Sequence, residues 1–233
     1  MKLAMDTTLA LTQTDLQSVS RGYAERLPQP IGGWMKRIVD VTFAGLAILL
    51  LSPLLVGLAF LVQFTSPGPV FYGHKRVGFG GKTFKCWKFR SMAANGEAVL
   101  ASHFRDNPDA LREWAETHKL RDDPRVTPIG RVLRKLSLDE LPQLFNILSG
   151  DMSIVGPRPI VNDEVRRYGA SLGHYLSTRP GLTGLWQVSG RSDVGYRQRV
   201  LMDRYYASNW SLFTDIAIIL RTVPAVLRSR GSY

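Results

Sequence analysis

The chain has 233 residues, of which 45% are hydrophobic and 21% are charged, and this composition excludes a wholly disordered protein. Its single cysteine, Cys86, excludes a secreted scaffold held together by internal disulfides. Lys and Arg outnumber Asp and Glu by 30 to 19, and the resulting net charge of +11 predicts an anionic partner. The excess lies in two blocks, because residues 75–96 carry a net +6 and residues 165–233 a net +7.

The N-terminal third divides into a leader and an apolar segment. Residues 1–33 are rich in Thr, Gln and Ser and end in a cluster of prolines and glycines, which predicts a flexible leader. Residues 34–66 form the predicted membrane segment, since no charged residue occurs from Val41 to Gln63. That length permits a membrane-spanning helix. A buried core helix of a soluble protein is the alternative.

The apolar segment contains Ser52-Pro53 near its midpoint. Proline removes a backbone donor and clashes with the preceding turn, so a kink or a break is expected, and the serine hydroxyl can satisfy a carbonyl that the proline frees. Basic residues flank both ends of the segment, and the positive-inside tendency favours the cytoplasmic side for both. We therefore predict a re-entrant helix hairpin broken at Ser52-Pro53, which would make the protein monotopic.

Residues 67–233 are predicted to form a cytoplasmic-face domain, so the fold class is α+β and mostly α. Residues 70–74 have a strand-like composition, and residues 78–81 predict a hairpin turn. Residues 83–90 mix apolar and basic side chains, which is a weak strand pattern and better fits an interfacial basic-aromatic surface. Residues 97–119 predict an exposed helical region interrupted at Pro108. Near the C-terminus, Ser211 can cap a helix that ends before Pro224 and has an apolar face. That face indicates either core packing or an interfacial amphipathic helix on a bilayer.

The sequence from 134 to 151 contains the acidic pair Asp139 and Glu140. Pro142 belongs in a first helical turn, so a helix is expected to begin between Ser137 and Asp139, and Gly150 is expected to end it. One interpretation is structural, because Ser137-x-x-Glu140 fits a capping box. The other is catalytic, with Asp139 as a nucleophile toward phosphorus and both acids as oxygen ligands of Mg²⁺.

Several arginines accompany this pair, one just upstream of it and three in motifs that contain proline or glycine. They are Arg134, Arg158, Arg179 and Arg191. The planar guanidinium suits phosphate oxygens, so arginines on stiff turns fit a site for a diphosphate, although any one of them could be structural. The sequence has no phosphate-binding GxxxxGK[ST] loop and no His or Cys cluster with metal-ligand spacing, which argues against an ordinary kinase or zinc protein.

These motifs resemble those of a known family, the bacterial sugar transferases that act as monotopic polyprenyl-phosphate phosphoglycosyl transferases. The matching segments are KRIVD (36–40), Ser52-Pro53, KFRSM (88–92), LRKLSLDELPQLFNILSGDMSIVGPRP (133–159), RPGLTGLWQVSGR (179–191) and DRYYASNWSLFTD (203–215). The pattern is most similar to members that transfer galactose phosphate at the start of succinoglycan-type exopolysaccharide synthesis. Ser91 is a mild departure, because threonine is common there.

The resemblance implies a two-step reaction at the cytoplasmic face of the bacterial inner membrane. A UDP-sugar, with galactose or glucose, would give its sugar phosphate to Asp139 and release UMP, and undecaprenyl phosphate would then accept the sugar phosphate. Glu140 would assist with Mg²⁺ or with the acceptor, and Arg134, Arg158 and Arg191 would lie near phosphate. Lys88 and Arg90 would lie near the site, and Ser52-Pro53 would be the hinge.

The resemblance also bears on partners and on rival functions. Membrane lipids, a second copy of the chain in a homodimer and later glycosyltransferases of the same pathway are the expected partners, and nucleic acid is not one of them. A rival interpretation is a membrane-tethered nucleic-acid-binding protein that stacks bases on Phe84, Trp87 and Phe89. Another is a non-catalytic scaffold for polysaccharide assembly. Neither rival explains the acidic pair with its arginines.

Overall fold

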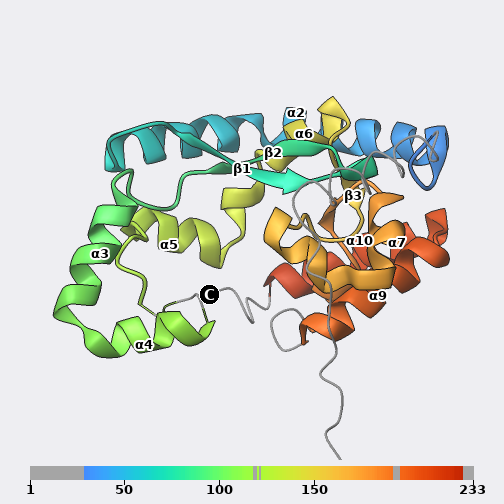
Figure 1. The fold of residues 1–233 in the computed structure, drawn as a ribbon. Coiled ribbons are helices and arrows are strands. Elements are labelled where there is room, and N and C mark those ends of the chain that lie inside the picture. The colour runs from blue at the N-terminus through green and yellow to red at the C-terminus, as the bar shows by residue number, and fades with distance from the viewer. Residues whose placement is uncertain (1–28, 118–119, 121, 191–194, 228–233) are drawn as a thin grey trace, which may run out of the picture.

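The structure is a computed structural model that describes residues 29–117, 120, 122–190 and 195–227. Most of the predicted leader lies outside this range. The helices, 3₁₀ helices (η) and strands, labelled as in Figure 1, are α2 (Gly33–Thr65), β1 (Phe71–Val77), η1 (Phe79–Gly81), β2 (Thr83–Phe89), α3 (Gly96–Asp106), α4 (Pro108–Thr117), α5 (Pro128–Lys135), η2 (Leu138–Glu140), α6 (Gln143–Ser149), β3 (Ser153–Val155), η3 (Asn162–Ser171), α7 (Leu172–Leu176), β4 (Gly181–Thr183), α8 (Leu185–Val188), α9 (Tyr196–Ser208) and α10 (Leu212–Leu227). The predicted α+β class, mostly α, is confirmed.

The long helix α2 runs along one edge of the molecule, above both groups of shorter helices (Figure 1). One side of it packs on the domain, with Ala44 and Val62 fully buried. The other side leaves large apolar residues exposed, among them Leu50 at 80% and Phe64 at 82%. Only 17% of its most apolar stretch is buried, so α2 is not the core helix of a soluble domain. By length and composition it could cross a membrane.

The predicted break at Ser52-Pro53 needs correction. Residues on both sides of Pro53 belong to the single helix α2, so the segment is not a helix-break-helix hairpin. The predicted role of Ser52 is confirmed, because its Oγ donates to the carbonyl of Leu49 at 2.8 Å. Leu49 lies four residues before Pro53 and would otherwise accept the hydrogen bond that proline cannot donate. This local substitution explains how the helix passes through the proline.

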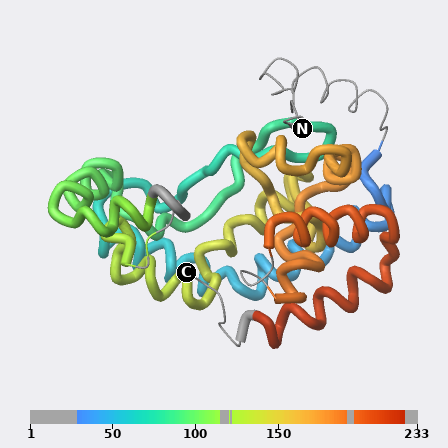
Figure 2. Tube along the Cα trace, turned by 60° about the horizontal axis from the view of Figure 1, so that its bottom comes forward, coloured from blue at the N-terminus to red at the C-terminus, as the bar shows by residue number. Residues whose placement is uncertain are grey.

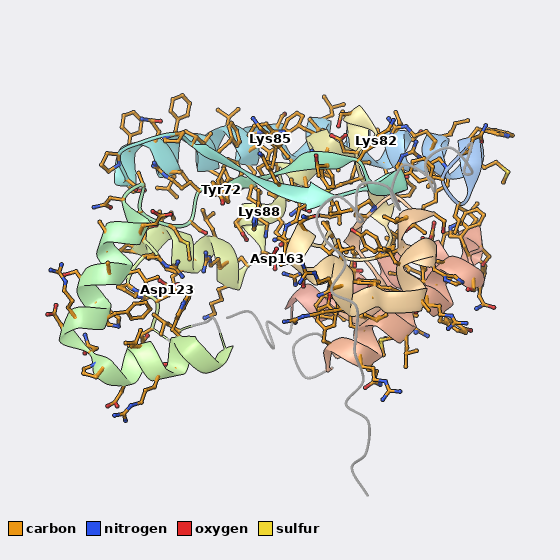
Figure 3. The ribbon with its side chains drawn as sticks, viewed as in Figure 1. Tyr72, Lys82, Lys85, Lys88, Asp123 and Asp163 are labelled. Carbon is orange, nitrogen blue, oxygen red and sulfur yellow. The ribbon has the colours of Figure 1, made fainter. Side chains whose placement is uncertain are left out.

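The strands β1 and β2 form an antiparallel hairpin around the predicted turn, pairing Phe71 with Phe89 and Val77 with Thr83, so residues 83–89 are a strand despite their weak pattern. The turn residues Gly80 and Gly81 have φ angles of 63° and 81°, a left-handed conformation that favours glycine. Side chains alternate along β2, so Lys85 and Lys88 project to opposite sides of the hairpin (Figure 3). Only Lys88 therefore reaches the segment that follows α5.

The segments on either side of the hairpin form two groups (Figure 2). Helices α3 and α4 lie on one side, and their boundary at Asn107 agrees with the interruption predicted at Pro108. The elements η3, α7, α9 and α10 lie on the other side, and η3, α7 and α9 enclose a core that includes Tyr168 and Tyr175. Strands β3 and β4 pair in parallel, Ser153 with Gly181 and Val155 with Thr183, and they join this group to α2 and α6.

The C-terminal helix α10 begins as predicted, because the Ser211 hydroxyl accepts from Thr214 N at 3.1 Å, but it continues through Pro224. The expected core packing of its apolar face is confirmed for only one part of that face, where Ile218 is 2% exposed. Four other apolar residues of α10 are exposed: Phe213, Ile216, Leu220 and Val223. Their spacing places them along one stripe of the helix.

Candidate active site

The acidic pair lies on the short element η2, between α5 and α6. Asp139 is 7% exposed, and its Oδ2 is 3.7 Å from Nζ of Lys88. The same Nζ donates to Oε1 of Glu140 at 2.6 Å. The predicted helix across this segment needs correction, because α6 begins at Gln143, after Pro142. Gly150 ends α6 in the left-handed conformation, as predicted, with φ 89°.

The capping-box interpretation of the acidic pair is wrong. Ser137 has a φ of 56°, and its side chain makes no capping hydrogen bond to η2. It is the only described residue other than glycine with a positive φ, a conformation that costs free energy and is found more often at functional sites. The turn presents Asp139 and Glu140 to Lys88 rather than to the helix backbone.

The apolar neighbours of the pair connect it to α2. Leu138 and Leu141 flank the two acids and pack against a cluster that includes Leu58 and Val62 of α2 and Phe89 of β2. Hydrophobic contacts on both sides of the pair therefore fix η2 against the long apolar helix. The candidate site lies at the inner side of the helix whose outer side is exposed and apolar.

Burial and charge have opposite effects on the two groups that meet here. Burial raises the pKa of Asp139, the positive charge of Lys88 lowers it, and Glu140 raises it again, with a net increase. For Lys88, burial lowers the pKa, but the charges of Glu140 and Asp139 outweigh burial and raise it. Lys88 thus stays protonated and is the main group that favours the ionised form of Asp139.

Arg134 also belongs to this site. Its Nε donates to Oγ of the buried Ser91 at 2.9 Å, and its charge lowers the pKa of Asp139. The serine that departs from the expected threonine thus retains the hydroxyl that orients the arginine. Gly130 allows α5 to approach this segment, since a Cβ there would lie 1.9 Å from the backbone oxygen of Ser91.

Arg158 is the second predicted arginine near the pair. It is exposed, and its Cζ lies 5.5 Å from the ring centre of Trp186. The surrounding protein and the positive charge of Arg199 lower the pKa of the Arg158 guanidinium, and the negative charge of Glu140 opposes this only in part. The flanking prolines and the hydrogen bond from Gly181 N to Pro157 O at 2.8 Å fix the backbone that presents it.

Two predicted arginines have other surroundings. Arg90 is buried and donates to the carbonyls of Ser66 and Pro67, at 2.5 and 2.7 Å, so it holds the turn that leaves α2. Gly68 accommodates it, since a Cβ at this residue would lie 2.1 Å from Nη1 of Arg90. The structure therefore does not direct the guanidinium of Arg90 to the acidic pair.

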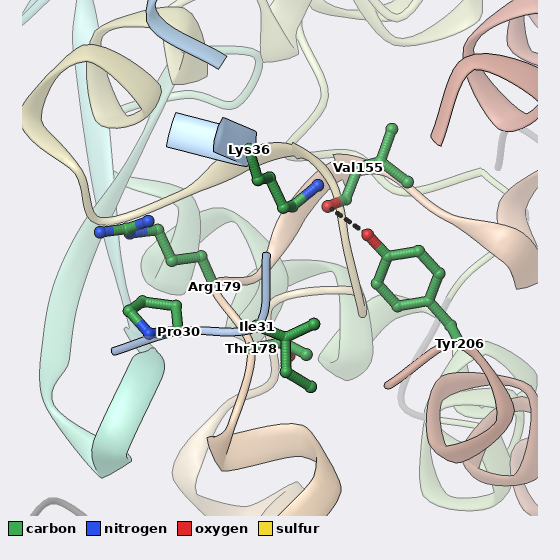
Figure 4. A pocket seen from close by; sticks show the side chains of 7 residues that line it. All are labelled: Pro30, Ile31, Lys36, Val155, Thr178, Arg179 and Tyr206. Carbon is green, nitrogen blue, oxygen red and sulfur yellow. Dashed lines mark hydrogen bonds between the residues drawn. The ribbon is translucent and has the colours of Figure 1, made fainter. Parts of the chain in front are cut away.

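Arg179 lies beside the first turns of α2. Its Nε donates to Gly150 O at 2.8 Å, and its charged neighbours are Arg37 and Asp40. It lines a small recess with Lys36 and Tyr206 (Figure 4). The structure gives Arg179 a structural contact here and does not bring it to the acidic pair. The remaining predicted arginine, Arg191, lies outside the described residues.

A buried ionic cluster behind Arg158 was missed by the sequence reasoning. Arg199 lies 5.2 Å from the Trp186 ring centre, and its Nη1 is 3.6 Å from Oε1 of Glu164. Asp203 is 2% exposed and accepts from the hydroxyl of Tyr168 at 2.7 Å. The spacing of Arg199 and Asp203, one helical turn apart, is the sequence signal for an ion pair, but it does not indicate burial.

The oxygen donors present suit a magnesium ion that is bound together with phosphate. In the parts of the chain that the structure covers, no three His, Cys, Asp or Glu side chains are arranged to hold a metal by themselves. Asp139 and Glu140 supply carboxylates, and Mg²⁺ commonly takes one or two of these with substrate phosphates and waters as its other ligands. The pair therefore fits a metal that arrives with a phosphorylated substrate.

Comparison with known proteins identifies relatives of this chain. The family described as "Bacterial sugar transferase" matches residues 31–229. The "Exopolysaccharide production protein ExoY" of Rhizobium meliloti is 58% identical over 205 residues, which cover 88% of this chain and 91% of that protein. The "Undecaprenyl-phosphate galactose phosphotransferase" of Salmonella typhimurium is 50% identical over 200 residues, 86% of this chain and 42% of that protein.

A third relative has a different sugar in its name. The "UDP-glucose:undecaprenyl-phosphate glucose-1-phosphate transferase" of Caulobacter vibrioides is 40% identical over 216 residues, which cover 89% of this chain and 75% of that protein. The names of the Salmonella and Caulobacter relatives describe transfer of a sugar phosphate with undecaprenyl phosphate, and they differ in the sugar. The match extends over α2, the acidic pair and the buried cluster. On this match, the chain belongs to the bacterial sugar transferase family.

Proposed function

We propose that this protein transfers a sugar 1-phosphate from a UDP-sugar, with galactose or glucose, to undecaprenyl phosphate in the first step of exopolysaccharide synthesis. The observation that carries the proposal is the buried Asp139 beside Lys88, fixed by Leu138 and Leu141 against the apolar helix α2. A soluble nucleotide sugar and a lipid phosphate can meet only at a membrane boundary. The names of the relatives support the same reaction class.

The chemistry proceeds in two balanced displacements on one phosphorus atom. A carboxylate oxygen of Asp139 attacks the phosphorus that bears the sugar, and the bond from that phosphorus to the bridging oxygen of UMP breaks. UMP leaves with the electron pair. An oxygen of undecaprenyl phosphate then attacks the same phosphorus, the bond to Asp139 breaks, and the carboxylate is regenerated.

The other residues of the site serve binding and charge. Lys88 keeps Asp139 ionised, and Arg134 and Arg158 supply guanidinium groups for phosphate oxygens. Asp139 and Glu140 would hold Mg²⁺, which neutralises phosphate charge when it is bound. Pathway partners, including later glycosyltransferases and a second copy of the chain, belong to the same proposal.

The contacts of α2 support a monotopic arrangement at the cytoplasmic face of the inner membrane. Near its start, Lys36 pairs with Asp215 of α10, and near its end Val62 packs against Leu133 of α5. These contacts are 26 residues apart, or about 39 Å along a helix. The same domain thus contacts both ends of α2. A helix that crossed the bilayer would leave this domain at one end, so these contacts argue against a transmembrane α2. The exposed stripe of α10 would rest on the same membrane.

Cysteine labelling tests this arrangement. We expect cysteines at positions 29 and 101, both exposed, to be protected from an impermeant maleimide in intact spheroplasts and labelled after permeabilisation. A cysteine in place of Leu50, on the apolar side of α2, should stay protected in both states. Cys86 does not compete, because it is 3% exposed and burial raises its pKa to about 11. Labelling of position 29 but not 101 in intact spheroplasts would contradict the arrangement.

The activity itself is tested with purified protein in nanodiscs, undecaprenyl phosphate, Mg²⁺ and a panel of UDP-sugars. We expect UMP and a lipid-linked sugar diphosphate in equal amounts, with UDP-galactose or UDP-glucose as the preferred donor. The panel identifies the sugar directly. A scaffold or a nucleic-acid-binding protein would release no UMP with any donor, and that result would refute the proposed function.

A further inference from the structure

Arg199 on α9 is a buried cation whose hydrogen-bonding capacity is largely unused. It is 7% exposed, and its Cζ lies 5.2 Å from the ring centre of Trp186 and 5.1 Å from that of Tyr196. Its Nε and Nη2 are buried without a hydrogen-bond partner. A guanidinium that served stability alone would be expected to have its donors satisfied, because a buried charge without hydrogen bonds is costly.

The carboxylates around Arg199 neutralise it only in part. Glu164 lies 3.6 Å from Nη1 and also accepts from the backbone N of Val161 at 3.0 Å. Asp203 lies 4.0 Å from Nε, accepts from Tyr168, and has a pKa that burial raises to about 6. The cluster also contains Arg76 and Arg158. Three guanidinium groups therefore face two carboxylates, and the cluster retains positive charge.

Arg199 and Arg158 contact the same indole ring. The Cζ atoms of Arg158 and Arg199 lie 5.5 and 5.2 Å from the centre of Trp186, which is itself 7% exposed. Cation–π attraction holds each guanidinium near the ring, whereas the two like charges repel each other. Arg199 is enclosed and cannot move away, but Arg158 is exposed and can. The exposed guanidinium lies near enough to the acidic pair for the charge of Glu140 to act on it.

We propose that Arg199 is a positioning residue that acts through Trp186 to hold the guanidinium of Arg158 toward the acidic pair, where it binds the diphosphate of the donor. This inference rests on the proposed function and adds to it a residue that does not itself touch the substrate. It also explains why the buried cluster carries excess positive charge, because this fixed charge further stabilises an anion that is bound by Arg158.

The test replaces Arg199 by Met together with Asp203→Asn, so that Asp203 is not left as a buried carboxylate without its cation, while Glu164 keeps Arg76 at 3.8 Å. Replacing a buried ion pair by apolar and neutral groups is often neutral or stabilising, so the melting temperature should stay the same or rise. The KM for the UDP-sugar should increase about tenfold or more, with a smaller change in kcat, because a charge-assisted contact to the donor is weakened. Arg199→Lys, which keeps the charge, should restore most of the affinity.

The matched control is Arg204→Met, an exposed arginine on the same helix, which should leave KM unchanged. Calorimetric titration with UDP alone separates this inference from the proposed function, because it needs no turnover. Weaker UDP binding by the Arg199 variant at an unchanged melting temperature supports the inference even if no donor is turned over. Wild-type affinity for UDP in that variant, or a loss of activity that only follows a lower melting temperature, would overturn it.

Discussion

Replacing Asp139 by Asn is expected to abolish release of UMP from a UDP-sugar, including in the absence of the lipid acceptor. The amide has nearly the shape of the carboxylate but cannot form the acyl phosphate, so the first displacement should slow by at least about a thousandfold. Wild-type protein without acceptor should release one equivalent of UMP and then stop. The measurement is a rapid-quench count of UMP per protein molecule.

Stability provides the control for this variant. Burial raises the pKa of Asp139 above that in the unfolded chain, so the ionised carboxylate costs the folded protein some stability, and the neutral amide should fold at least as well. Asp163→Asn removes an exposed carboxylate on η3 and should leave the UMP burst intact (Figure 3). A full burst from the Asp139→Asn protein would show that another group is the nucleophile.

The acidic pair could be singled out in the sequence because its pattern is local. Asp139 and Glu140 are adjacent in the chain, and Pro142 and Gly150 indicate where a helix can begin and end. The start of that helix was nevertheless misplaced, since the left-handed conformation of Ser137 depends on how α5 and η2 pack against α2. A sequence pattern shows which turns are allowed, but tertiary contacts select one of them.

Residue patterns alone could not predict contacts between distant parts of the chain, and only the family resemblance placed Lys88 near the site. Lys88 reaches Glu140 across 52 positions in the chain, and Arg199 meets Trp186 and Glu164 from three separate elements. Arg90 and Arg179 were expected at phosphate because arginine suits phosphate, but arginine donors satisfy backbone carbonyls equally well. Residue type alone does not distinguish these two uses.

The structure of α2 could not be predicted from the charged residues at its ends and the proline at its middle. Charged flanks and Ser52-Pro53 favoured a broken hairpin, and the structure instead keeps one helix by redirecting the serine hydroxyl to Leu49. The expectation that both ends lie on one side of the membrane now rests on different grounds, namely the contacts of Lys36 and Val62 with one domain. The proline affects local geometry, and the domain contacts constrain the topology.

Removal of the charge at Lys88 should have the second-largest effect on turnover. In Lys88→Met the two carboxylates lose their shared cation, so kcat/KM should fall about a hundredfold or more. Lys88 lowers the pKa of Asp139, and without it that pKa rises further. The nucleophile is then ionised only at higher pH. The acid limb of the pH–rate profile should therefore move to higher pH.

Two further variants isolate the charge of Lys88 as the cause of this shift. Lys85→Met removes a lysine from the other side of the same strand, where its Nζ lies over Trp87, and should change neither rate nor profile. Lys88→Arg keeps a positive charge near Asp139 and should keep the acid limb close to its wild-type position, even if geometry lowers the rate. Loss of the Lys88 charge must raise the pKa of Asp139, because Lys88 is the main group that lowers it. An acid limb of Lys88→Met that coincided with that of the wild type would therefore show that the group that titrates is not Asp139.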